Sequence, residues 1–242
     1  MLIIGLAGQA GSGKSAVAEY LVQRYGFLRF SFSDALYAEV AAAFGLPDES
    51  LLRDRETKEM ATPALSIQTC ADSHFRALIA GFCQRHGLDP GVTTFSPRWV
   101  LQHWGTEYRR AQDPNYWVKQ TNGWIWEITS AAPYPELRPY LFVNDSVRFE
   151  NERQWVHALG GSIWHLSRET AKPVSSHESE NPLPVWANER EIFNNHTLDY
   201  LHKGVDQLLT TAAKFVRLEP PAPMTEPVNT TQDEPCGPSA AN

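Results

Sequence analysis

Near its N-terminus the chain contains the stretch Gly8-Gln9-Ala10-Gly11-Ser12-Gly13-Lys14-Ser15. This stretch matches G-x-x-x-x-G-K-[ST], the phosphate-binding loop, in which backbone N–H groups converge on phosphate oxygens. The apolar run at residues 2–7 predicts a buried parallel strand before the loop, and residues 16–25 predict a helix after it. A strand, a glycine loop and a helix N-terminus in this order favour bound negative charge. The stretch therefore predicts an α/β fold that binds a nucleoside triphosphate.

Each conserved position of this motif type has a chemical role. The Lys14 ammonium is expected to reach the β- and γ-phosphates of ATP, and the Ser15 hydroxyl is expected to hold Mg²⁺. Gly11, Ser12 and Gly13 complete the predicted phosphate-binding set, because glycine lets the backbone approach the phosphates closely.

Composition limits the remaining possibilities. The chain has 242 residues, of which 42% are hydrophobic and 20% are charged, as in an ordinary globular protein with one large or two small domains. Its net charge of -7 argues against nucleic acid as a partner. Cys70, Cys83 and Cys236 form no C-x-x-C pair, and no signal-like or membrane-length apolar run is present. We therefore expect a cytoplasmic protein without a membrane partner.

A second strand is expected at residues 28–32, followed by Ser33 and Asp34 and a helix that ends near Gly45. Ligands of α/β sheets lie at the carboxyl ends of strands, which is where Asp34 would lie. Its carboxylate could orient an acceptor, or it could simply cap the helix. The two roles are compatible.

The segment 48–93 is harder to interpret. Residues 48–59 are highly charged and indicate a solvated helical face, whereas residues 73–86 carry apolar side chains at helical spacing and indicate a core helix. The cysteines and histidines of this segment fit no zinc-ligand spacing.

Residues 96–110 form a dense polar and aromatic stretch. Ser96 and Pro97 predict a helix start, and Arg98 and Gln102 share one helical face. A guanidinium can bind a phosphate or a base edge, and an amide can both donate to and accept from a base. Aromatic rings beside these groups indicate either a stacking site for a flat heteroaromatic ligand or simply core packing. The rings in question are Trp99, Trp104, Trp117, Trp124 and Trp126.

The C-terminal half adds further candidates. Residues 139–145 predict a buried strand that ends at Asp145, where a carboxylate would help to hold Mg²⁺. Arg148 and Glu152 follow and share one helical face. They could form a simple surface ion pair, or Arg148 could have a functional role at the carboxyl end of the strand. Arg168 leaves the strand at residues 162–166 for a lid-like loop and could support the transferring phosphate. A short strand at 191–193 and an amphipathic helix after Thr197 complete the fold.

Several of these segments together resemble the phage-type deoxynucleoside monophosphate kinases, within the phosphate-loop NMP kinase group. The resemblance runs from Met1 to about Val216 and is carried by five segments besides the loop: Ser33-Asp34, the pattern S-P-R-x-x-x-Q-x-x-G-T-E-x-x-R at 96–110, V-R-F-x-N-E at 147–152, His177-Glu178-Ser179-Glu180, and Asn195-x-Thr197-Leu198. One position departs from the family pattern, which often has Asp two residues before the arginine of V-R-F. Here that residue is Ser146, and the acid is Asp145.

The resemblance implies ATP- and Mg²⁺-dependent phosphorylation of a deoxynucleoside monophosphate (dNMP) to the diphosphate. Lys14, Asp34, Arg148 and Arg168 would be catalytic, and Ser15 and Asp145 would hold the metal. The dNMP would contact Asp34, Arg98, Gln102, Gly105, Thr106, Arg110, Trp117, Asp145, Arg148 and Glu152. Arg98, Arg110 and Arg148 would hold its phosphate in line.

The predicted architecture is a three-layer α/β fold of the phosphate-loop kinase type with a central parallel sheet. We expect a kinase domain at 1–218, with a helical insertion that binds the monophosphate at about 48–130 and a lid-like loop at about 167–190. The proline-rich segment 219–242 predicts a disordered tail.

Two other functions remain open on the sequence. A kinase for a nucleoside or for dephospho-coenzyme A would share the loop and the acid after strand two. A nucleotide-binding module without an acceptor would share only the loop. The accepted bases and the oligomeric state, with a homodimer as one option, are not determined by these residues.

Overall fold

The computed structural model describes residues 1–131, 140–171 and 182–212 of the chain. The predicted tail and the centre of the predicted lid-like loop lie outside the described residues. Five strands form the main sheet: β1 Leu2–Ala7, β2 Leu28–Phe30, β5 Leu141–Val147, β6 Ser162–Ser167 and β7 Arg190–Phe193. A small hairpin pairs β3 Thr62–Ser66 with β4 Thr94–Phe95.

The helices account for most of the remaining described chain. They are α1 Lys14–Tyr25, α2 Asp34–Ala43, α3 Ser50–Arg53, α4 Ser73–Arg85, α5 Pro97–Gln102, the π-helix η1 His103–Arg110, α6 Tyr116–Ala131, α7 Glu150–Ala158 and α8 Leu198–Ala212.

The main sheet is parallel throughout, in the order β2-β5-β1-β6-β7. β1 lies at its centre and is buried along its whole length, as its unbroken apolar sequence predicts. Successive side chains of β1 point to opposite faces of the sheet and therefore belong to two different cores. Ile3 packs with residues of α7, while Ile4 packs with residues of α1 and α8. The predicted three-layer α/β fold with a central parallel sheet is therefore confirmed.

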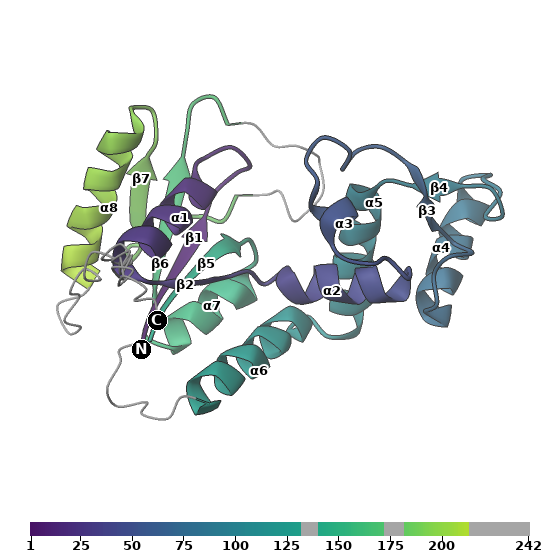
Figure 1. Cartoon of the computed structure of the whole chain (residues 1–242), viewed down its shortest axis with the longest axis horizontal. Helices are drawn as coiled ribbons and strands as arrows, with labels where there is room; N and C mark the ends of the chain where they lie inside the picture. Colours follow the sequence, from purple (N-terminus) through teal and green to yellow (C-terminus); the bar gives the residue numbers. More distant parts are fainter. Residues whose placement is uncertain (132–139, 172–181, 213–242) are drawn as a thin grey trace, which may run out of the picture.

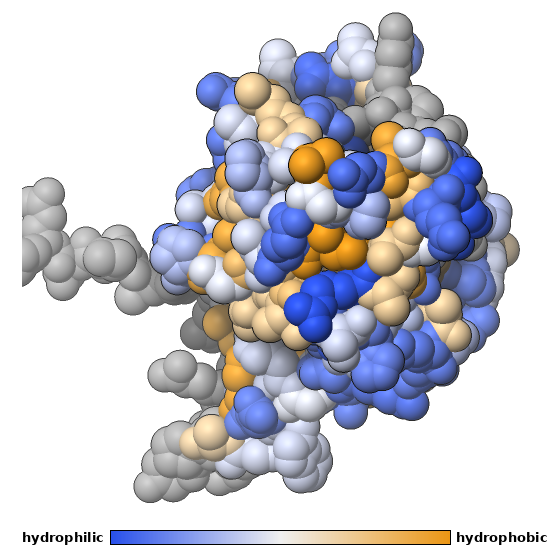
Figure 2. Space-filling model, turned by 90° about the vertical axis from the view of Figure 1, so that its right-hand side faces the viewer, coloured by the Kyte–Doolittle hydropathy of each residue, from blue (hydrophilic) through white to orange (hydrophobic). Residues whose placement is uncertain are grey.

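A second body of structure, which we call the helical lobe, lies beside the sheet. It contains α2 to α5, η1 and the β3–β4 hairpin, and α6 runs along its lower side toward α7 (Figure 1). Its core is continuous with the α7 side of the sheet, because Phe75 and Trp104 belong to the same apolar cluster as Ile3. The outer end of this lobe is largely hydrophilic, with smaller apolar areas between the polar residues (Figure 2).

The segment 48–59 was predicted as a solvated helical face. Its charged side chains are exposed or half-buried, as predicted, but the helical part of the prediction is wrong. Only Ser50–Arg53 is helical, in the short α3. Arg53, Arg55 and Lys58 also line the cavity above the phosphate loop instead of facing bulk solvent only. The charge pattern indicated exposure but did not reveal that a tertiary fold would bring these cations to a site.

None of the described helices is long and apolar enough to cross a membrane.

Candidate active site at the phosphate loop

The phosphate loop connects β1 to α1, as predicted. Gly8, Gly11 and Gly13 all have positive φ angles, of 135°, 79° and 108°. A side chain at Gly8 or Gly13 would also collide with neighbouring atoms, at Gly8 with the backbone of Leu166. These positions therefore require glycine for both conformation and space. The Lys14 ammonium donates to the carbonyl oxygens of Gly8 at 2.6 Å and Gln9 at 2.8 Å.

The chain after β7 braces this loop, a feature that sequence reasoning did not assign. The Asn194 side-chain amide donates to the carbonyl oxygen of Ser12 at 3.0 Å. Asn195 accepts from the backbone N–H of Glu169 at 2.9 Å, at the root of the predicted lid-like loop. The sequence signals were two adjacent asparagines at a strand end, where ligands of α/β sheets gather, and the family-like segment Asn195-x-Thr197-Leu198.

A cavity opens above the loop, which we call the loop cavity. It contains Gly11, Gly13, Lys14 and Ser15 from the predicted phosphate-binding set. Asp34 and Asp145 line the same cavity, so the structure brings both predicted carboxylates to the phosphate loop. Ser12 and Arg168 instead line a neighbouring hollow on the β6 side of the loop.

A second cavity, the inner cavity, lies between the sheet and the helical lobe. Its volume is about 120 Å³, below the range of about 300–1,000 Å³ that is typical of sites for drug-sized ligands. It is lined by the following residues that the sequence predicted for the dNMP: Arg98, Gln102, Gly105, Thr106, Arg110, Trp117, Arg148 and Glu152. They come from α5, η1, α6 and the start of α7.

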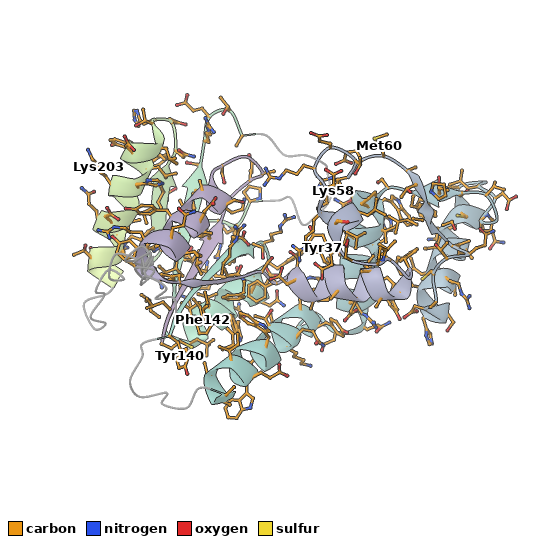
Figure 3. All side chains as sticks on the ribbon, viewed as in Figure 1. Tyr37, Lys58, Met60, Tyr140, Phe142 and Lys203 are labelled. Carbon is orange, nitrogen blue, oxygen red and sulfur yellow. The ribbon has the colours of Figure 1, made fainter. Side chains whose placement is uncertain are left out.

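The two cavities adjoin. Ser33, Tyr37, Lys58, Arg98, Ser146 and Arg148 line both of them. Lys58 donates to the Tyr37 hydroxyl at 2.8 Å, and Figure 3 shows the two side chains together between the sheet and the helical lobe. A ligand in the inner cavity and a ligand on the phosphate loop would therefore meet at a boundary carrying Lys58, Arg98 and Arg148.

The sequence predictions missed several lining residues of the inner cavity. Phe32, Leu36 and Phe149 give it apolar walls, and Tyr37 and Lys58 stand at its mouth. By contrast, Trp117 is the one tryptophan of the predicted cluster that lines it. Trp104 is buried in the core, and Trp99 stacks between Phe95 and His103. Stacking on a ligand therefore stays a prediction for Trp117, and the core interpretation applies to Trp99 and Trp104.

Arg110 and Glu152 form a buried ion pair in the wall of the inner cavity, with side-chain exposures of 11% and 3%. The Arg110 guanidinium lies 3.7 Å from the ring centre of Phe149. The second Glu152 oxygen accepts from the backbone N–H groups of Arg148 at 2.8 Å and Phe149 at 3.2 Å, which caps α7. Burial raises the pKa of Glu152, while Arg110 and the two N–H groups oppose that rise. In this arrangement the pair supports the wall, and the contact of Arg110 with an acceptor phosphate stays a prediction.

The Asp34 carboxylate differs from the expected helix cap. Ser33 occupies the N-cap position of α2, and Asp34 is the first helical residue. One Asp34 oxygen accepts from the backbone N–H of Ser31 at 2.7 Å, and the other accepts from Arg53 at 3.1 Å. The capping interpretation is therefore wrong in its detail, since the carboxylate closes the turn before the helix and remains in the loop cavity.

The end of β5 explains how Asp145 reaches the same cavity. Gly5 pairs with Asn144 and Ala7 pairs with Val147, so β5 carries one more residue than β1 across this interval. Both Asp145 and Ser146 consequently line the loop cavity. Asp145 forms an ion pair with Arg29, whose Nε lies 2.9 Å from the carboxylate. The Ser146 hydroxyl accepts from Ser31 at 2.6 Å.

Comparison with known proteins adds one informative match. No protein-family model matches the chain. The chain is 26% identical over 224 residues to the "Putative deoxynucleotide monophosphate kinase" of Acanthamoeba polyphaga mimivirus, a match that covers 89% of this chain and 100% of the viral protein. It also aligns with the unliganded crystal structure of a sugar kinase from Janibacter sp. HTCC2649, with 14% identity, a TM-score of 0.40, and coverage of 87% of this chain and 92% of that one. A TM-score of 0.40 is too low to support a conclusion about the function of this chain.

The similarity to the viral protein agrees with the phosphate loop and supports a kinase, and hence a phosphotransferase, as the class of this protein.

Proposed function

We propose that this protein transfers the γ-phosphoryl group of ATP to a deoxynucleoside monophosphate, forming a deoxynucleoside diphosphate and ADP. The observation that carries the proposal is the pair of adjoining cavities, one on the phosphate loop and one with apolar walls and a basic mouth. Such a pair suits two nucleotides whose phosphates face each other. The name of the viral relative supports the same acceptor class.

The protein does not need to form a covalent bond with the substrates, because catalysis of phosphoryl transfer depends mainly on positioning and charge neutralisation. ATP would lie on the phosphate loop with Lys14 at its β- and γ-phosphates. The acceptor base would occupy the inner cavity, whose lining includes Trp117, Phe149 and Gln102. Its phosphate would meet Arg98 and Arg148 at the boundary of the cavities, and Lys58 adds a third cation there. The acceptor phosphate is an oxyanion, so Asp34 would orient it without removing a proton.

The oxygen groups at the loop fit a magnesium ion. Ser15 and Asp145 line one cavity and offer a hydroxyl and a carboxylate, the ligand types that Mg²⁺ prefers. When bound, the ion would neutralise charge on the donor phosphates. Arg29 already pairs with Asp145, so this carboxylate lies in an environment that accommodates a cation.

The decisive experiment measures ADP release from Mg-ATP with one acceptor at a time. The panel contains the four common dNMPs, the ribonucleoside monophosphates, a nucleoside and dephospho-coenzyme A. We expect strong ADP release with at least one dNMP. Release only with a nucleoside or with dephospho-coenzyme A would replace the acceptor class, and ATP binding without acceptor-dependent release would favour a nucleotide-binding module.

The first prediction concerns Lys14. Lys14→Ala removes the cation at the donor phosphates, and we expect turnover to fall by about a thousandfold, as for loss of other preorganised charge-stabilising groups. Acceptor binding, measured by tryptophan fluorescence without ATP, should be retained. Because Lys14 also donates to two loop carbonyls, thermal unfolding should be followed as the control. A variant with near-normal turnover would contradict the proposed donor site.

A further inference from the structure

A carboxylate in the helical lobe joins three elements that wall the inner cavity. Glu39 of α2 accepts hydrogen bonds from Trp104 Nε1 at 2.9 Å and from Arg109 Nε at 2.8 Å, both on η1. It also accepts from the Tyr116 hydroxyl at the start of α6. Its side chain is 23% exposed, and that of Arg109 is 21% exposed. Among the described residues, Glu39 is not itself part of the lining of the inner cavity.

Each of these contacts lies next to a residue that does line the cavity. Leu36 precedes Glu39 by about one helical turn, Trp104 precedes Gly105, and Tyr116 precedes Trp117. The three lining residues approach one another closely. A Cβ added at Gly105 would lie 3.4 Å from Leu36 Cδ2 and 3.9 Å from Trp117 Nε1. Trp117 Nε1 also donates to the Gly105 carbonyl at 3.1 Å. Small shifts between α2, η1 and α6 would therefore change the width of the cavity.

The partners of Glu39 lie in a cluster of aromatic rings. The Arg109 guanidinium lies over the rings of Trp104, Tyr108 and Tyr116, at 5.4, 4.5 and 5.1 Å from their centres. Burial, together with Glu39, raises the pKa of Tyr116 to about 12, so this hydroxyl stays a neutral donor at working pH. Removing the carboxylate would leave a cation and a phenol without their shared acceptor inside an aromatic cluster, which favours movement of the helices.

We propose that Glu39 is a positioning residue that sets the spacing of α2, η1 and α6, and thereby fits the inner cavity to the flat base of the acceptor. This inference rests on the proposed function. In this proposal Glu39 does not contact the substrate. Its effect should therefore appear in acceptor affinity and leave the phosphate loop, which lies in the other body of the structure, unchanged.

The test compares Glu39→Ala and Glu39→Gln with the control Asp72→Asn. Asp72 also accepts from a tyrosine hydroxyl of η1, that of Tyr108 at 2.9 Å, and it accepts from the backbone N–H of Phe75 at 2.8 Å. It joins α4 to η1 in the same lobe, and neither Asp72 nor these partners line the inner cavity. Asp72 also acts electrostatically on Arg109, so this control removes a negative charge near the same guanidinium while the hydrogen bonds of Glu39 to η1 and α6 are kept.

We expect Glu39→Ala to raise the KM for the dNMP by about tenfold to a hundredfold, because displacements near 1 Å have effects of this size. The KM for ATP should stay unchanged. Glu39→Gln keeps an oxygen acceptor, so its acceptor KM should lie between those of the wild type and Glu39→Ala. Asp72→Asn should lower Tm without changing the acceptor KM. Tryptophan fluorescence on dNMP addition, without ATP, gives acceptor affinity independently of turnover.

An unchanged acceptor KM in Glu39→Ala, or equal rises for dNMP and ATP, would overturn the inference while leaving the proposed function intact. If Glu39→Ala does not fold, Glu39→Gln decides: an acceptor KM no higher than that of Asp72→Asn would overturn it. A wild-type protein that neither binds nor phosphorylates any dNMP would overturn the proposed function itself, and this inference with it.

Discussion

At the scale of single residues, each of the two carboxylates that line the loop cavity forms an ion pair with an arginine. Asp145 pairs with Arg29, and Asp34 pairs with Arg53 at 3.1 Å. The Arg29 side chain is 42% exposed, whereas that of Asp145 is 13% exposed, so the arginine is the partner that can move into solvent. If Asp145 takes part in holding Mg²⁺, the metal must compete with Arg29 for the charge of this carboxylate, whose Oδ2 atom accepts from Arg29.

This competition predicts that Arg29→Gln lowers the Mg²⁺ concentration needed for half-maximal activity by about twofold to fivefold, since partly exposed ion pairs contribute about 0.2–1 kcal/mol. Mn²⁺ binding in the presence of ATP, followed by electron paramagnetic resonance, should tighten by the same factor. Arg53→Gln is the matched control, because it releases Asp34 and leaves Asp145 paired. An unaltered metal requirement in Arg29→Gln would argue against Asp145 as a metal ligand.

Arg98 is the second residue whose role can be tested singly. It lines both cavities and forms an ion pair with Glu59, whose side chain is 58% exposed. We expect Arg98→Ala to raise the acceptor KM by about tenfold to a hundredfold, because hydrogen bonds to charged groups contribute about 1.5–3 kcal/mol. Steady-state kinetics at saturating ATP measures this change. Glu59→Gln should have little effect on the same KM, and a comparable loss in that variant would show that the ion pair matters more than a phosphate contact.

At the scale of elements, the residues immediately before β7 are held to β6 and α7 by the buried carboxylate of Glu189. Glu189 accepts from His157 at 2.9 Å, from His165 at 2.7 Å and from the backbone N–H of Trp186 at 2.8 Å. The Arg153 guanidinium, on α7, lies 3.4 Å from the same carboxylate. Because Arg153 directly follows Glu152, α7 connects the root of the predicted lid-like loop to the wall of the inner cavity.

This cluster predicts a pH dependence of stability. Burial raises the pKa of Glu189, but the Trp186 N–H, the two histidines and Arg153 outweigh it, and the net pKa is lowered. A lowered carboxyl pKa contributes stability above the unfolded value, which is about 4.5, and this contribution is lost as pH falls below it. The fall in Tm between pH 5 and pH 3 should therefore be smaller in Glu189→Gln than in the wild type. Equal falls in the two proteins would contradict an ionised Glu189 in the native state.

At the scale of the whole molecule, the proposed function would place one nucleotide in each of the two adjoining cavities, between the phosphate loop and the helical lobe. Ligands that contact both bodies stabilise the folded chain in proportion to ln(1 + [L]/Kd), about 2.7 kcal/mol at a hundredfold excess over Kd. For a chain of this size that corresponds to a rise in Tm of about 5–10 °C.

We therefore expect a dNMP alone and ATP alone each to raise Tm, and both together to raise it further. Thermal unfolding with a non-hydrolysable ATP analogue measures these shifts. Lys14→Ala should abolish the shift caused by the analogue and keep the shift caused by the dNMP. A single shift, lost completely in Lys14→Ala, would indicate one nucleotide site instead of two.

The sequence alone determined the features that depend on neighbouring residues. The phosphate loop, β1, α1 and the capped start of α5 follow from local spacing, because glycine conformations, apolar periodicity and the Ser96 cap act within a few residues. The grouping of Arg98, Gln102 and Arg148 was also predictable, but through a family resemblance and not through spacing.

Only the tertiary structure decided which of the remaining residues meet. It brought Arg53, Arg55 and Lys58 over the phosphate loop, turned Glu152 toward Arg110, and joined α2, η1 and α6 at Glu39. The register shift of β5 and the π-helix at His103–Arg110 likewise left no periodic signal. The physical reason is the same in each case: these are contacts between segments distant in sequence, whose partners are chosen by packing and charge pairing in the folded chain and not by local propensity.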